Sequence, residues 1–386
     1  MTATASPGNR APEGTVKERS KGRAPGAFKG RGGGRVHATV RFAAGPVGFA
    51  LRLRVLLTCV LLLALAFAAL IASLAMGDYE LPWSDVVTGL FNAGPEDAEL
   101  VVHELRLPRA LVAIMVGFAL GLAGAVFQAV TRNPLAGPDI VGITAGAGAG
   151  AVVAILAGGV GTGVSATYGP VPLGALVGAV TTGLVVYFLA FRQGTITGYG
   201  FVLVGIAANG MLVAFTRWAL ARVDIDAATR ATAWLTGSLE NRDYTQVRWM
   251  ALGLLLLVPP LVALVRPYRM LQFGDDIATG LGVPTRAART ALLLVGTCLA
   301  ALATACAGPV VFVALAAPQI ARGLAGTAEI PLFTAGFAGA VVVGGADLLA
   351  RTAFPETVPV GIVTGLIGAP YLLWFLGRAN KVGRGG

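Results

Sequence analysis

The sequence predicts an all-α polytopic membrane protein with about ten transmembrane helices. Of its 386 residues, 56% are hydrophobic and only 12% are charged, whereas soluble domains carry about a quarter charged residues. Apolar runs long enough to cross a bilayer, which takes about 20 residues, recur throughout the chain. Their approximate ranges are 53–76, 108–130, 140–158, 171–191, 199–220, 247–265, 287–305, 308–323, 331–350 and 358–377.

Basic residues gather at the N-terminus. Residues 1–54 hold eleven Lys or Arg and two Glu, which accounts for nearly all of the formal net charge of +10. Residues 1–50 are rich in Gly, Pro, Ser and Arg and lack apolar periodicity, so they cannot bury enough surface to fold. We therefore predict a disordered basic cytoplasmic tail over 1–50, favoured over a nucleic-acid-binding arm, and a transmembrane domain over 51–380. Weak contact with anionic lipid is expected near Arg52 and Arg54.

Loop charges set the predicted orientation in the cell membrane. The basic tail is expected to stay in the cytoplasm, because Lys and Arg are enriched in cytoplasmic loops. The loop over 77–105 holds seven acidic residues and no Lys or Arg, which places it on the opposite side. An even number of spans returns the C-terminus to the cytoplasm. The alternate loops agree, since they carry Arg132, Arg192, Arg266, Arg269, Arg286, Arg289, Arg322, Arg378, Lys381 and Arg384.

Two spans are predicted to be irregular. The third is short and glycine-rich, and the eighth begins with Gly-Pro, so either is expected to be bent or broken. The pairs Gly117/Gly121 and Gly174/Gly178 have the four-residue spacing that allows close contact between helices. We expect both pairs to pack within one subunit rather than to form a dimer seam.

Few polar residues interrupt the apolar runs. Asn209 and Arg217 lie in the fifth run, and each is a candidate functional residue. Alternatively, Asn209 makes a hydrogen bond between helices and Arg217 snorkels to the membrane interface. The three cysteines lie in apolar runs, which favours core packing over disulfides or metal binding. The sequence predicts no metal site, no cofactor and no catalytic residues. The cysteines are Cys59, Cys298 and Cys306.

The stretch from Leu105 to Gly150 carries an ordered set of motifs. It contains Arg-Leu-Pro-Arg, a glycine-rich span, Arg-Asn-Pro-Leu-Ala-Gly-Pro-Asp, Gly-Ile and Gly-Ala. This set resembles the permease subunit of iron-siderophore and cobalamin ABC importers, the FecCD type. Later segments resemble the same family. They are residues 234–239 (Trp-Leu-Thr-Gly-Ser-Leu), 273–284, 308–322 and 346–371.

Residues 273–284 predict a short helix that ends sharply. Two carboxylates, the first being Asp275, fall in its first turn, where the helix dipole favours negative charge. Ala278 is small enough to let a partner surface approach, and Gly282 before Pro284 predicts a left-handed end. In the 308–322 segment Gln319 replaces the family's histidine, which leaves a hydrogen-bonding role but removes a titrating one.

The resemblance implies a five-plus-five inverted repeat, similar to the permease of the cobalamin importer. It also implies several partners. These are a second permease subunit, either a copy or a paralogue, ATP-binding cassette ATPase subunits, an extracytoplasmic substrate-binding protein and the membrane lipid, with no nucleic acid. The chain is not expected to be an enzyme, because it contains no Gly-x-x-x-x-Gly-Lys-(Ser/Thr) phosphate loop.

The resemblance also assigns roles to particular residues. Docking of the binding protein is implied for Arg106, Arg109 and Arg351. A cytoplasmic gate is implied for Asn133, Pro134, Leu135 and Pro138, with a second gate over 193–197. Coupling to the ATPase is implied for Gly274, Asp275, Ala278, Leu281 and Gly282. Interfacial snorkelling for the three arginines and an ordinary loop helix are the simpler alternatives.

The resemblance favours a ferric siderophore as cargo, with cobalamin or haem as alternatives. An ion-coupled secondary transporter is a rival, and it would need an intramembrane carboxylate such as Asp347. Asp347 and Arg351 share a helix face, four residues apart, so they are also expected to pair with each other. A polytopic membrane enzyme is a further rival, although no cluster of His, Asp and Glu supports it.

Overall fold

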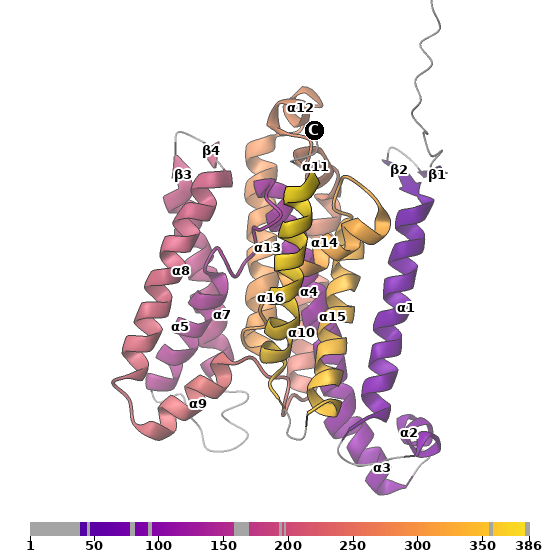
Figure 1. Cartoon of the computed structure of the whole chain (residues 1–386), viewed down its shortest axis with the longest axis vertical. Helices are drawn as coiled ribbons and strands as arrows, with labels where there is room; N and C mark the ends of the chain where they lie inside the picture. The colour runs from indigo at the N-terminus through magenta and orange to yellow at the C-terminus, as the bar shows by residue number, and fades with distance from the viewer. Residues whose placement is uncertain are drawn as a thin grey trace, which may run out of the picture. The chain divides into compact units, whose positions relative to one another are not determined.

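Helices occupy all ten predicted spans. The computed structural model describes residues 39–44, 47–77, 82–91, 95–157, 170–192, 195–196, 198–354 and 358–382. The all-α prediction is confirmed for the membrane domain (Figure 1). The ten helices are α1 (Leu53–Ala75), α4 (Leu107–Thr131), α5 (Ile143–Leu156), α7 (Pro170–Ala190), α8 (Gly198–Leu220), α10 (Tyr244–Ala263), α13 (Thr285–Ala307), α14 (Val313–Ala325), α15 (Leu332–Thr352) and α16 (Val360–Val382).

The third and eighth of these helices are too short to cross a bilayer alone. Within the described residues, seven helices are long and apolar enough to span, one of them continuous over Glu96–Thr131. By contrast, α5 has 14 residues and α14 has 13. At 1.5 Å per residue each is roughly 20 Å long, against about 30 Å of hydrocarbon. The predicted irregularity is confirmed, and the non-helical segments 132–142 and 308–312 precede the two short helices.

Shorter elements connect the long helices. The helical ones are α2 (Trp83–Leu90), α3 (Glu96–Leu100), the π-helical turn η1 (Val101–Arg106), α9 (Ile225–Leu235), α11 (Val265–Leu271) and α12 (Asp275–Gly280). Two antiparallel hairpins pair β1 (Thr39–Ala44) with β2 (Val47–Arg52) and β3 (Phe191–Arg192) with β4 (Thr195–Ile196). Regular structure thus begins before residue 50. The rest of the predicted tail, residues 1–38, lies outside the described residues.

The long helices run between two ends of the domain, here named the α12 end and the α9 end (Figure 1). The start of α1 lies at the α12 end, because Arg52 and Arg269 of α11 both approach Glu329, at 3.8 and 3.2 Å. Helices α2, α3 and α9 lie at the opposite end. Residues 274–284 therefore share an end with the basic start of α1, as the sequence predicts.

Close glycine contacts hold the helices together. A Cβ on Gly117 of α4 would overlap the backbone of Gly339 of α15, and one on Gly121 would overlap the preceding turn of α15. Gly174 and Gly178 of α7 lie equally close to the backbone of α5. The prediction that both glycine pairs pack within one subunit is confirmed, since small residues let helix backbones approach without a hydrophobic driving force.

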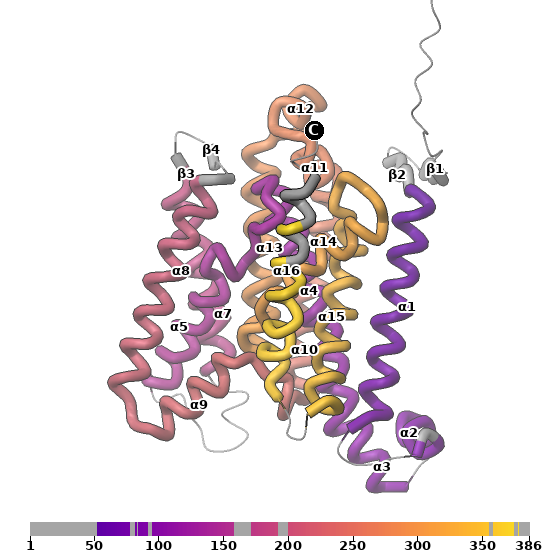
Figure 2. Tube along the Cα trace, viewed as in Figure 1, coloured from indigo at the N-terminus to yellow at the C-terminus, as the bar shows by residue number. Residues whose placement is uncertain are grey.

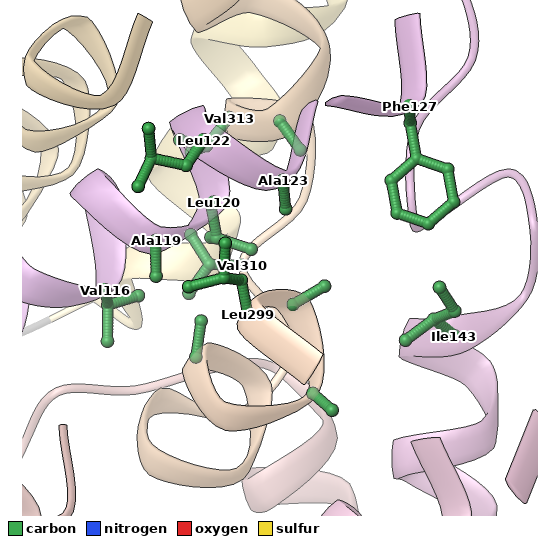
Figure 3. Packing of buried hydrophobic residues seen from close by; sticks show 14 of the residues in the cluster. Val116, Ala119, Leu120, Leu122, Ala123, Phe127, Ile143, Leu299, Val310 and Val313 are labelled. Carbon is green, nitrogen blue, oxygen red and sulfur yellow. The ribbon is translucent and has the colours of Figure 1, made fainter. Parts of the chain in front are cut away.

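Helix α4 forms the centre of the packing. It contacts α13, α14 and α15, and its side chains Val116, Leu122 and Phe127 are fully buried. Figure 3 shows Val116 and Leu120 of α4 near Leu299 of α13. In Figure 2 the chain leaves α4 near the α12 end and runs to α5, which lies beside α7 and α8. This exit segment is the predicted gate.

Candidate functional site

Helix α12 forms a capped projection at the α12 end. It begins after Gly274 (φ +114°) and is followed by Gly282 (φ +77°). The N–H of Gly282 donates to the carbonyl of Thr279 (2.9 Å) and the N–H of Val283 to that of Ala278 (3.0 Å). This pair of bonds closes a helix at a left-handed glycine. The short helix and its left-handed end are therefore as predicted.

Charged side chains tie α12 to two long helices. Arg289 of α13 donates to both carboxylate oxygens of Asp275, at 2.7 and 2.9 Å. Arg132, at the end of α4, approaches the same carboxylate at 3.8 Å. We name Arg132, Asp275 and Arg289 the Asp275 cluster. It connects the projection both to α13 and to the start of the predicted gate.

Three apolar side chains are exposed on α12 and beside its two ends, next to the exposed Asp276. Phe273, Ile277 and Leu281 are 49%, 53% and 55% exposed, while Ala278 is fully buried. The space that Ala278 leaves is therefore taken up within this chain, so the interpretation that it admits a partner surface is wrong. Its small size lets α12 lie close on α11 and α13. A partner at this end would contact the three exposed apolar side chains instead.

The predicted gate begins where α4 ends. Arg132 adopts a left-handed conformation (φ +54°) and terminates the helix. The side chain of Asn133 then accepts a hydrogen bond from the N–H of Leu135 (2.9 Å), which is the turn that asparagine favours before proline. Pro134 and Pro138 prevent the helix from continuing. The structure thus brings these four gate residues into one compact, locally bonded linker.

Asp139 continues this linker and joins the two short helices. Its carboxylate accepts a hydrogen bond from the hydroxyl of Thr144, in the first turn of α5. The backbone of Phe312, immediately before α14, lies beside the same carboxylate, whose second oxygen has no hydrogen-bond partner among the described residues. Sequence reasoning quoted Asp139 only as part of a motif and missed this role. The signal available was a carboxylate placed between two predicted helix breaks.

A cavity of about 410 Å³ opens beside Asp139. Asn209 and Arg217 of α8 line it, so both polar residues singled out in the fifth run lie at one site. Thr232 and Leu235 of α9 line it as well. The cavity therefore extends from the linker toward the α9 end.

Two glutamines join α4 to α14. Gln319 donates its side-chain amide to the side chain of Gln128, and Gln128 donates to the carbonyl of Leu315 (3.0 Å). Both glutamines are buried. The hydrogen-bonding role expected of Gln319 is confirmed, since a buried amide needs partners. The start of α14 is thereby fixed to the end of α4 that leads into the gate.

A second set of charges lies where α4 begins and α15 ends. Asp347 is 1% exposed and accepts two hydrogen bonds from Arg109, at 3.0 and 2.9 Å. Arg351 approaches its other oxygen at 3.4 Å, which confirms the predicted pairing along α15. We name Arg109, Asp347 and Arg351 the Asp347 cluster. A carboxylate already held by two arginines is poorly suited to binding a transported ion.

Two of the three predicted docking arginines also hold the end of α1. Arg106 is buried and donates to the carbonyl of Leu74 at 2.7 Å. Arg351 donates to the hydroxyl of Ser73 and to the carbonyl of Met76 (3.3 Å). These bonds satisfy carbonyls that the last turn of a helix leaves without partners. The structure therefore brings the three arginines together, with their charged groups directed within the chain.

Other predicted sites lie partly beyond the structure. Of the second gate over 193–197, residues 193, 194 and 197 lie outside the described residues, and the side chains of the others are not described. Within the described part of the chain, no group of three or more His, Cys, Asp or Glu residues is placed to hold a metal ion.

Comparison with known proteins gives a consistent result. The profile of the FecCD transport family matches residues 62–378. The ferric enterobactin transport system permease protein FepG of Escherichia coli is 40% identical over 85% of this chain and 98% of its own length. The achromobactin transport system permease protein CbrC of Dickeya dadantii is 40% identical over 82% and 90%. Among solved structures, an inward-facing metal-chelate type ABC transporter matches with a TM-score of 0.72 and 25% identity, covering 83% of this chain and 98% of that one.

Proposed function

The chain belongs to the FecCD transport family, and we propose that its cargo is a ferric siderophore carried across the cytoplasmic membrane. It is a multi-pass membrane permease of the ABC importer type. The cargo is inferred from relatives named for ferric enterobactin and achromobactin. Cobalamin or haem is the competing cargo, and the uptake experiment below separates them.

The position of α12 is the observation that carries the proposed mechanism. Ile277 on α12 and the flanking residues Phe273 and Leu281 are exposed apolar side chains at the α12 end, where basic residues gather. We place this end in the cytoplasm, by the enrichment of Lys and Arg in cytoplasmic loops. An ATPase subunit docking there would push on α12. The Asp275 cluster would pass the movement to α13 and to the start of the gate.

The cavity beside Asp139 is proposed as this subunit's part of the pathway. It extends toward the α9 end, which the orientation places outside the cell. At about 410 Å³ it is near the lower end of small-molecule sites, which span roughly 300–1,000 Å³. We therefore propose that a second permease subunit completes the pathway. The linker at Asn133 to Pro138 would close it toward the cytoplasm.

Docking of a binding protein at the α9 end remains a proposal for Arg106, Arg109 and Arg351. Complementary charge would guide such a partner into register. Each arginine, however, already bonds within the chain. A binding protein could therefore contact these guanidinium groups only where they remain accessible. Alternatively, the arginines could aid docking indirectly, by maintaining the surface to which the partner binds. A test of docking has to separate the two.

Uptake by intact cells tests the proposed function. The gene would be deleted and cells starved of iron, then supplied with iron-55 bound to a siderophore, with haem or with labelled cobalamin. We expect loss of siderophore uptake alone, and recovery when the gene is restored. The matched control is a strain lacking the partner ATPase, which should show the same loss. Selective loss of cobalamin or haem uptake would assign the permease to that cargo instead.

A further inference from the structure

A second cavity lies at the α12 end, beside the start of α1. Its volume is about 280 Å³, and it does not share lining residues with the cavity at Asp139. We name it the α1 groove. Most of its wall is apolar and comes from four parts of the chain, the helices α1, α10, α11 and α15. Its apolar lining includes Val55, Leu56, Val262, Val265, Leu332 and Phe333.

The rim of the α1 groove carries excess positive charge. Arg52 and Arg269 both pair with Glu329, at 3.8 and 3.2 Å, and all three residues line the groove. One carboxylate cannot neutralise two guanidinium groups. The guanidinium of Arg54 lies beside Gly326 in the same turn between α14 and α15. This rim therefore suits a second anion, and phosphate oxygens accept well from arginine.

The interior of the groove carries no charge. Tyr268 lies at its inner wall, fully buried, and donates its hydroxyl to the carbonyl of Ile330 at 2.9 Å. Burial raises the pKa of the Tyr268 phenol, so the hydroxyl stays protonated. A ligand that fits this site has an apolar part inside and an anionic group at the rim. The groove is too small for a metal chelate but large enough for part of a lipid acyl chain.

The surroundings of the groove identify the ligand class. Leu57, Val60 and Leu61 on the exposed side of α1 are each more than half exposed, and such an apolar helix face suits contact with lipid. We propose that the α1 groove binds one anionic phospholipid of the cytoplasmic leaflet. Its phosphate would lie on Arg52 and Arg269 and one acyl chain would enter along Leu56 and Phe333. The bound lipid would lie across the groove and connect α1 to α11.

This proposal goes beyond the transport function and does not rest on it. Only the choice of leaflet depends on the proposed orientation. Lipid binding can be measured on the purified chain in detergent, without ATPase, binding protein or cargo. Failure of the lipid experiment would therefore leave the uptake experiment untouched, and the reverse also holds.

Selective binding of phosphatidylglycerol is the first test. The purified full-length chain would be mixed with phosphatidylglycerol or phosphatidylcholine of identical acyl chains, and retained lipid measured by native mass spectrometry. We expect phosphatidylglycerol to be retained preferentially. Arg269→Gln should weaken its binding about fivefold, since one basic residue near an anionic lipid surface contributes about that factor. Arg230→Gln, an exposed residue of α9 at the far end, is the matched control and should change nothing.

Filling the groove is the second test and leaves every charge in place. Leu56→Trp should block the acyl chain and abolish selective retention, whereas Leu57→Trp on the adjacent exposed face should not. Equal retention of the two lipids by the natural chain would overturn the proposal. So would undiminished retention in both Arg269→Gln and Leu56→Trp. Displacement of the lipid by millimolar inorganic phosphate would show that the rim binds free phosphate, and would overturn the lipid assignment.

Discussion

The Asp347 cluster and the Asp275 cluster have the same composition, one aspartate between two arginines. The first lies at the α9 end of the domain and the second at the α12 end. Asp347 is 1% exposed and Asp275 is 39% exposed. Within each cluster one ion pair is close, at 2.9 and 2.7 Å respectively, and the other is longer, at 3.4 and 3.8 Å. Burial of the aspartate is the main difference between them, because Arg289 and Arg109 are buried to a similar extent, with side chains 11% and 14% exposed.

This difference indicates what each cluster can do. A buried pair that loses one partner leaves an uncompensated charge, at a cost of about 3–5 kcal/mol. An exposed pair contributes only about 0–1 kcal/mol, because water and salt compensate its charges. The Asp347 cluster therefore fixes α4 and α15 in a single arrangement. The Asp275 cluster can rearrange at little cost, which suits a projection that has to move.

Removing Asp347 should have the largest effect on stability. Asp347→Ala leaves Arg109 and Arg351 confronting each other in a buried site, so the free energy of unfolding should fall by about 3–5 kcal/mol. Thermal unfolding of the purified chain in detergent would measure the change. Asp275→Ala is the matched control, expected to cost about 1 kcal/mol or less. Equal losses in the two variants would remove the distinction based on burial.

A charge swap should separate the structural role of Arg109 from docking. Arg109→Glu places a second carboxylate against Asp347 and should destabilise the chain by several kcal/mol, about as much as the loss of a partner. Adding Asp347→Arg restores an ion pair and should recover at least half of that loss. Binding-protein affinity would be measured on the stable double variant. Recovered stability without recovered affinity supports direct docking, whereas recovery of both assigns Arg109 to structure alone.

Changes on the exposed face of α12 should reverse the pattern, with small effects on stability and large effects on transport. Ile277→Asp introduces a charge where the ATPase is proposed to contact an apolar surface, and uptake should fall about tenfold or more. The free energy of unfolding should change by only about 0.5 kcal/mol, as for most surface substitutions. Ile225→Asp on α9, also exposed, is the matched control. Full uptake by Ile277→Asp would exclude this face from coupling.

Features with a local cause could be predicted from the sequence. The ten helices follow from runs of apolar residues, and the end of α12 follows from Gly282, because few other residues adopt its left-handed conformation. The contact between Asp347 and Arg351 follows from their spacing of four. The irregular start of the eighth span follows from its Gly-Pro. Each of these depends on residues within a few positions of one another.

Features that depend on distant residues could not be predicted. Arg109 and Asp347 are 238 positions apart, so nothing in either segment indicated that they pair. The same holds for Asp139, which lies beside the backbone of Phe312, before α14. Ala278 was expected to face a partner surface but is buried within the chain. A six-residue helix has too little periodicity to distinguish its inner face. Which arginines stay exposed is likewise a property of packing and not of sequence pattern.

Salt should expose the smallest difference between the clusters. At 1 M salt the screening length is about 3 Å, against about 8 Å at physiological ionic strength. Screening should weaken the exposed contact between Arg132 and Asp275 but hardly affect the buried Asp347 cluster. Consequently the stability cost of Asp275→Asn should shrink toward zero in high salt, while that of Asp347→Asn should persist. Unfolding both variants at two salt concentrations measures this. If the stability cost of Asp275→Asn were independent of salt, Asp275 would be held mainly by its hydrogen bonds from Arg289. Helix α12 would then be more rigidly fixed than the exposure of Asp275 indicates.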